Sequence, residues 1–121
     1  MTRINLVPPV DLMDQHLIRE YGELPRIFGN VMKAVEAKKR LHNFKIPPDY
    51  VLGTGHMTFF YNKLLFLEKR FASIVAEMHN RGFRTTYTTL KPEFRETIPA
   101  EWWGDYTPTE KGIELSKTRI A

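Results

Sequence analysis

The sequence predicts a single, all-α domain in which three helices are joined by long ordered loops. Three segments carry apolar residues at three- and four-residue steps, the period of a helix with one buried face. The chain has 121 residues, and 42% of them are hydrophobic, so one packed core is expected. No repeat, low-complexity stretch or internal linker divides the chain, and residues 1–121 are therefore expected to form one unit.

The first helix is expected from Asp11 or Asp14 to about Lys39, because Asp is a good N-cap at either position. One face of this helix is apolar and the opposite face is polar. The apolar face holds Leu17, Tyr21, Leu24, Phe28, Val31 and Val35, and the polar face holds His16, Arg19, Glu23, Arg26, Asn30 and Lys33. Pro25 removes one backbone donor inside this pattern, which predicts a kink next to Glu23.

The second helix is expected from about Phe59 to Arg81, with Thr58 as its N-cap and Gly82 just past its end. Its apolar stripe consists of Phe60, Leu64, Leu67, Phe71, Ile74, Val75 and Met78. The run Gly53-Thr54-Gly55-His56 precedes it. We interpret this run as a tight turn, since it lacks the Lys-Ser/Thr ending of a phosphate-binding loop.

The third helix is expected to begin at Thr107-Pro108-Thr109-Glu110 and to run to the C-terminus. In this run a Thr caps the helix, Pro occupies the first turn, and Glu lies three residues after the first Thr. The connections at residues 40–57 and 83–106 are rich in Pro, Gly and Thr, and they are expected to be ordered loops.

The composition excludes several classes of protein. The chain has no Cys, which excludes a disulfide framework, and its four His lack metal-ligand spacing, so no metal is expected. No apolar run is long enough to span a bilayer, and a cytoplasmic protein without a membrane partner is expected. The 18 Lys and Arg exceed the 14 Asp and Glu, and the net charge of +4 suits a polyanionic partner.

The N-terminus carries a candidate nucleophile. A small residue at position 2 allows Met1 to be removed, which leaves Thr2 with a free α-amine. The pKa of an α-amine is about 7.7–8.0, so an appreciable fraction is unprotonated at neutral pH, and the adjacent Arg3 would lower that pKa further. Together with one carboxylate, such an amine can attack a sugar C1′ and form an imine.

Motifs along nearly the whole chain point to one family. They are Thr2-Arg3-Ile4-Asn5-Leu6, Asp14-Gln15-His16-Leu17, Glu20-Tyr21, Glu23-Leu24-Pro25-Arg26, Phe44-Lys45-Ile46, Leu52-Gly53, Gly55-His56, Thr58-Phe59-Phe60-Tyr61, Arg81-Gly82-Phe83 and Gly104-Asp105-Tyr106. In this order they resemble the phage pyrimidine-dimer DNA glycosylase family, also called endonuclease V. Each motif alone is weak, whereas the combination is specific.

The resemblance implies a monomeric DNA repair glycosylase with abasic-site lyase activity, acting on cyclobutane pyrimidine dimers in double-stranded DNA without a cofactor. Thr2 would displace the base and form an imine, which requires that Met1 be absent. Glu23 would stabilise the positive charge that develops at C1′ and assist the later proton abstraction at C2′. The alternative for Glu23 is a solvated carboxylate that pairs with Arg19 or Arg26 at helical spacing.

The same resemblance, together with the basic charge, predicts a set of DNA contacts. The residues expected to contact DNA are Arg3, Gln15, His16, Arg26, Lys33, Lys117 and Arg119. For Lys33 and Lys117 the alternative is a solvated surface charge. The basic run from Lys38 to Lys45 is a candidate for non-specific tracking along DNA.

The sequence departs from the family pattern in two places. Gly22 replaces an arginine beside the catalytic Glu, and the chain stops at Ala121, whereas the family type continues into a basic, aromatic-rich tail. Trp102 and Trp103 are either replacement aromatics or a core plug. Two alternative functions therefore remain open: an abasic-site lyase without dimer specificity, and a non-catalytic nucleic-acid-binding protein on the same scaffold.

Overall fold

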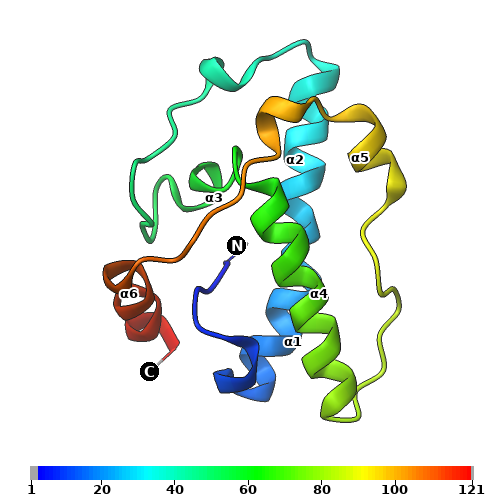
Figure 1. Ribbon diagram of the computed structural model, residues 1–121, viewed down its shortest axis with the longest axis vertical. Helices are drawn as coiled ribbons and strands as arrows, with labels where there is room; N and C mark the ends of the chain where they lie inside the picture. Colours follow the sequence, from blue (N-terminus) through cyan, green and yellow to red (C-terminus); the bar gives the residue numbers. More distant parts are fainter. Residues whose placement is uncertain (1–2, 121) are drawn as a thin grey trace.

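The computed structural model describes residues 3–120, and these residues are mainly helical, as predicted (Figure 1). The α-helices are α1 Asp14–Glu23, α2 Pro25–Glu36, α3 His56–Phe59, α4 Leu64–Asn80, α5 Pro92–Thr97 and α6 Glu110–Ile120, with 3-10 turns at Pro9–Asp11, Leu41–Asn43 and Ala100–Trp102. Within residues 3–120 the only β-pairing is an isolated bridge between Lys63 and Trp103. No helix among them is long and apolar enough to cross a membrane.

The first predicted helix is divided at Pro25 into α1 and α2. Leu24 keeps a helical backbone, and its N–H donates to the Glu20 carbonyl, whereas Pro25 opens α2 without an N–H. The second of these helices ends at Glu36 rather than near Lys39, because Lys38 adopts a φ of +63° and the N–H of Lys39 returns to the Ala34 carbonyl. That arrangement is a helix-ending motif in which the left-handed residue turns the chain away.

The second predicted helix begins five residues later than expected, at Leu64, and α3 is a separate short turn. A distant segment causes the break. Gly104 donates its N–H to the Asn62 carbonyl and accepts the N–H of Leu65, so it replaces helical partners at the start of α4. A Cβ on Gly104 would lie 2.3 Å from that Asn62 oxygen, so only glycine allows this approach. The predicted end is confirmed, with Gly82 at a φ of +82°.

The predicted loop at residues 83–106 contains α5 and the 3-10 turn that ends at Trp102. Trp102 is fully buried and Trp103 is partly buried, so the first of the pair is a core residue. The last helix, α6, begins at Glu110. Thr109 rather than Thr107 caps it, since the Thr109 hydroxyl accepts the N–H of Gly112 at 3.0 Å.

The helices are arranged so that the N-terminal segment lies between two of them. Helix α1 packs on α4, and α2 packs on α5. Figure 1 shows the described N-terminal residues, from Arg3 on, running between α6 on one side and α1 and α4 on the other. Their apolar side chains Ile4, Leu6 and Val7 are buried in the core. The fold therefore encloses the segment that directly follows the predicted nucleophile.

Candidate active site

The predicted nucleophile, Thr2, lies outside the described residues, but the segment that follows it is well defined. The Arg3 N–H donates to Glu23 Oε1 at 3.3 Å. The chain therefore enters the described region beside the carboxylate that the sequence singles out. This backbone contact joins residues that are 20 positions apart in the sequence.

Glu23 is the last residue of α1, at the point where Pro25 divides the predicted helix. Its side chain is only 13% exposed, which differs from a freely solvated carboxylate. Arg26 lies one turn further along at 4.0 Å from Glu23 Oε2, and its own side chain is largely exposed. The carboxylate is therefore partly desolvated and has a cation at one edge.

A small cleft surrounds this carboxylate. It is lined by Arg3, Asn5, His16, Arg19, Glu20, Glu23 and Arg119, and its volume of about 40 Å³ is enough for roughly one water molecule. Within residues 3–120, two buried atoms of lining residues have no hydrogen-bond partner: the acceptor Asn5 Oδ1 and the donor Arg119 Nη1. Nearly all buried polar atoms in folded proteins are paired with protein or with ordered water, so these two atoms have capacity for a further hydrogen bond.

Arg119 reaches the cleft from α6, at the other end of the chain. Burial lowers the pKa of Arg119, and the nearby Tyr50, Glu20 and Glu23 oppose this shift. A guanidinium remains charged under such conditions. The cleft therefore brings a fixed positive charge to the same place as the partly buried carboxylate.

Sequence reasoning missed a buried ion pair behind the cleft. Glu20 and Arg70 are 1% and 7% exposed, and both Nε and Nη2 of Arg70 donate to the Glu20 carboxylate. Glu20 Oε1 also accepts the N–H of Asn5 at 3.3 Å and its Nδ2 at 2.9 Å. The signal in the sequence is a charged residue on the apolar face of a helix: Glu20, for example, lies between Leu17 and Leu24.

His56 is a further residue near the cleft to which the sequence assigned no role. Its side chain is buried, and its Nε2 accepts the Ile4 N–H at 2.9 Å. Its Nδ1 lies 2.7 Å from the Val51 carbonyl oxygen, which accepts a hydrogen bond from the N–H of that nitrogen. Gly55, at a φ of +90°, places His56 at the start of α3, and the predicted tight turn is present.

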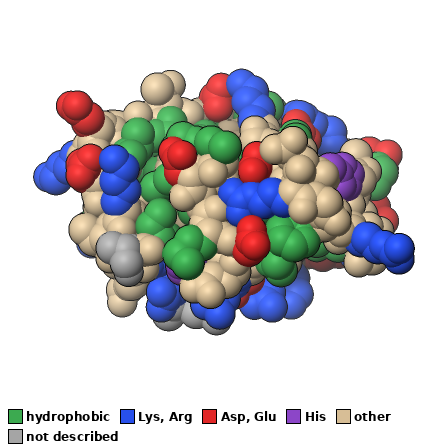
Figure 2. All heavy atoms as spheres, turned by 90° about the horizontal axis from the view of Figure 1, so that it is seen from below, with side chains coloured by type: hydrophobic (Ala, Val, Ile, Leu, Met, Phe, Trp, Pro, Cys, Tyr) green, Lys and Arg blue, Asp and Glu red, His purple; other side chains and the backbone are tan. Residues whose placement is uncertain are grey.

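The remaining predicted DNA contacts lie outside the cleft. Gln15, Lys33 and Lys117 are exposed, and Lys117 pairs with Glu114 at 3.3 Å. The structure thus groups Arg3, His16, Arg26 and Arg119 around Glu23 but not the other three. Figure 2 shows one face of the surface, on which Lys and Arg side chains gather along the lower edge. No group of His, Asp or Glu within residues 3–120 has metal-binding geometry.

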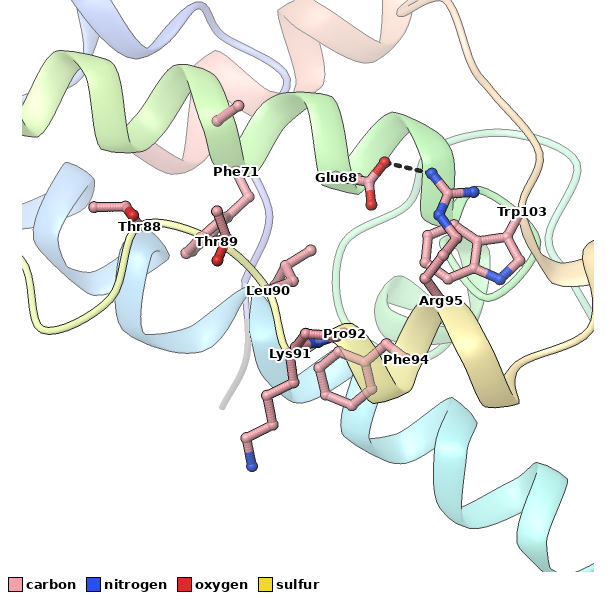
Figure 3. Close-up of a pocket in the computed structure, with 11 residues that line it drawn as sticks. Glu68, Phe71, Thr88, Thr89, Leu90, Lys91, Pro92, Phe94, Arg95 and Trp103 are labelled. Atoms are coloured by element: carbon pink, nitrogen blue, oxygen red, sulfur yellow. Dashed lines mark hydrogen bonds and ion pairs between the residues drawn. The ribbon is translucent and has the colours of Figure 1, made fainter.

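A larger cavity lies between α4 and the segment that leads into α5 (Figure 3). Its volume is about 280 Å³, and it is lined largely by apolar side chains that include Phe71, Leu90 and Trp103. Its carboxylate, Glu68, is held by Arg95 at 2.6 Å, and Arg95 also stacks on Trp103. Because this carboxylate is already paired and lies on an apolar wall, the cleft at Glu23 is the better candidate for chemistry.

Comparison with known families identifies the scaffold. A family model described as pyrimidine dimer DNA glycosylase matches residues 1–90. The match covers the N-terminal segment, Glu23, His56 and α4, and it ends before α5 and before α6, the helix that contributes Arg119 to the cleft. The match spans well over half of the chain and agrees with the resemblance of the motifs. The chain therefore belongs to the pyrimidine dimer DNA glycosylase family.

Proposed function

We propose that this protein acts on cyclobutane pyrimidine dimers in duplex DNA by breaking a glycosidic bond with the α-amine of Thr2, and that it then cuts the strand as an abasic-site lyase. Family membership supports the glycosylase activity. The observation that carries the mechanism is the contact between the Arg3 N–H and the partly buried Glu23 carboxylate. An amine nucleophile one residue upstream would react within reach of that carboxylate.

The chemistry requires only these two groups. The Thr2 nitrogen forms a bond to C1′ as the bond between C1′ and the base breaks, the base leaves with the electron pair of that bond, and the proton lost by the amine passes to the base. Opening of the sugar ring at the C1′–O4′ bond gives an imine. Abstraction of a C2′ proton then forms a double bond and expels the 3′ phosphate. Glu23 stabilises the positive charge at C1′ and accepts the C2′ proton.

The cations around Glu23 would bind phosphates on either side of the reacting sugar. Arg3, Arg26 and Arg119 come from the N-terminus, α2 and α6, and a DNA strand crossing the cleft would contact all three. Gln15, His16, Lys33 and Lys117 would extend this contact over neighbouring nucleotides. We propose that a single copy of the chain forms this interface.

A cavity next to Arg26 suits a nucleotide that has left the helix. It is lined by Pro25, Arg26, Gly29, Tyr87, Thr89, Leu90, Lys91, Pro92 and Phe94, and its volume is about 560 Å³. Tyr87 is 40% exposed and stacks on Tyr21, so a large aromatic surface is available there. Enzymes of this chemistry extrude a nucleotide to reach the sugar, and aromatic walls stabilise the unstacked base.

The second candidate is an abasic-site lyase without dimer specificity. Gly22 favours it, because the family arginine at this position is absent and the residue is exposed with open space around it. Loss of one cation beside Glu23 would weaken recognition of the distorted duplex and leave the amine chemistry intact.

One experiment separates the candidates. Matched duplexes that contain a dimer, an abasic site or no lesion are incubated with the protein and borohydride, and covalent complexes are counted. The proposed function predicts trapping on the first two duplexes, and a lyase predicts trapping on the abasic duplex alone. Glu23→Gln should suppress trapping on the dimer duplex, whereas Glu36→Gln, an exposed carboxylate on α2, should have no effect. Absence of trapping on both damaged duplexes would leave a non-catalytic binding protein.

A further inference from the structure

The segment from Arg3 to Leu6 is held by side chains rather than by secondary structure. Ile4, Asn5 and Leu6 are buried, and buried backbone N–H groups need partners. Arg3 donates to Glu23 on α1, Ile4 to His56 on α3, Asn5 to Glu20 on α1, and Leu6 to Ser116 on α6. Four consecutive backbone N–H groups are thus held by four different side chains. We call these side chains, Glu23, His56, Glu20 and Ser116, the N-terminal clamp.

Within this clamp His56 holds Ile4, the first fully buried residue after the predicted amine. The Val51 carbonyl can only accept, so it fixes the imidazole proton on Nδ1 and leaves the lone pair of Nε2 for the Ile4 N–H. Tyr50 packs edge-on against His56 and donates its hydroxyl to the Ile4 carbonyl at 2.7 Å. Both polar groups of the Ile4 backbone are therefore fixed by one pair of adjacent rings.

We propose that His56 is a positioning residue for the reaction: its neutral imidazole fixes the Ile4 backbone, two residues after the amine that would attack C1′. This inference rests on the proposed function. Thr2 is two residues before Ile4, a span of at most about 7 Å of chain, so a displaced Ile4 backbone would change the positions that the amine can reach. A misplacement of about 1 Å at a reacting group can reduce a rate roughly 100-fold.

The surroundings of His56 keep its imidazole neutral. Burial lowers the pKa of His56 to about 4, the Val51 carbonyl opposes this shift, and the positive charges of Arg119 and Arg3 add to it. Tyr50 and Phe60 pack against the ring and carry no charge at neutral pH. Protonation would turn Nε2 into a donor facing the Ile4 donor, so the clamp is closed at neutral pH and opens in acid.

The test compares variants at position 56 by two independent measurements. His56→Leu removes the acceptor, His56→Gln supplies an amide oxygen in its place, and His79→Gln changes an exposed histidine on α4 as a control. Hydrogen exchange of the Ile4 amide is measured on the free protein. Single-turnover nicking and affinity are measured on a duplex that contains a dimer.

The inference predicts that His56→Leu raises Ile4 exchange at least about tenfold and lowers the single-turnover rate about 10- to 100-fold, with DNA affinity within about twofold. His56→Gln should restore most of both, and the control should match the wild-type protein. An unchanged rate in His56→Leu, or a loss confined to DNA affinity, would overturn the inference.

A measurement on the wild-type protein covers the case in which His56→Leu does not fold. Imidazole ¹⁵N shifts at neutral pH should identify the tautomer protonated on Nδ1, and the tautomer protonated on Nε2 would overturn the clamp. If the wild-type protein neither nicks nor traps DNA, the proposed function and the catalytic part of this inference fail together. Ile4 exchange would then still decide whether His56 holds the segment.

Discussion

The buried ion pair between Glu20 and Arg70 gives the sharpest prediction about stability. Arg70→Leu would remove the cation that pairs with the Glu20 carboxylate, which is only 1% exposed. Removing one partner of a buried pair typically costs about 3–5 kcal/mol. The two hydrogen bonds from Asn5 to Glu20 remain, so we expect the lower end, about 3 kcal/mol. For a domain of this size that corresponds to a fall in Tm of roughly 10–15 °C.

Urea and thermal unfolding measure this loss, and two variants control it. Lys69→Leu makes the same change one residue earlier on α4, where the pair with Asp105 is exposed, and it should cost less than about 1 kcal/mol. Glu20→Gln added to Arg70→Leu removes the buried charge but keeps an acceptor for Asn5, so it should recover much of the loss. A cost below about 1 kcal/mol for Arg70→Leu, or further destabilisation by Glu20→Gln, would refute the reasoning.

Other expected outcomes concern the cleft. Glu23→Gln should keep DNA affinity within about twofold but lower single-turnover base release about 100-fold or more, since it removes charge stabilisation at C1′ rather than a phosphate contact. Arg26→Gln should weaken binding to damaged and undamaged duplexes alike. It should also reduce the slope of log binding constant against log salt concentration by about one, and an unchanged slope would exclude a phosphate contact. Gly22→Arg should stabilise α1 by up to about 1 kcal/mol and raise DNA affinity, because the position is open, and lower stability in urea unfolding would contradict this. His56 has a folded pKa of about 4 against an ordinary value of 6.5, so stability should fall as the pH drops through this window, by about 3 kcal/mol at most, and His56→Gln should flatten the slope.

The fold was predictable where local signals decide the structure. The break at Pro25 and the end of α4 at Gly82 follow from residues whose backbone preferences are strong. The start of α4 was wrong, because Gly104 reaches Asn62 from 42 positions away along the chain, and no local pattern reveals that contact. The helix α5 was missed because it is short and its single buried residue, Phe94, gives no period.

The sequence singled out Glu23 and Arg3 as a carboxylate and a cation near the predicted amine, and the structure joins them by a hydrogen bond, whereas their roles in chemistry stay predictions. Glu20, Arg70 and His56 act through partners in other segments, and a lone charged residue on an apolar face only signals that some partner exists. Lys117 was grouped with Arg119 by sequence, yet it is exposed on α6 and outside the cleft, and its DNA contact stays a prediction.

The identity of the atom that attacks C1′ is the central claim, and one measurement tests it directly. Protein that begins at Thr2 is trapped with borohydride on a duplex containing a dimer, digested, and analysed by mass spectrometry. The account predicts a sugar adduct on the α-nitrogen of Thr2, and no adduct after that amine has been blocked. An adduct on a lysine Nζ, or undiminished trapping by the blocked protein, would contradict it.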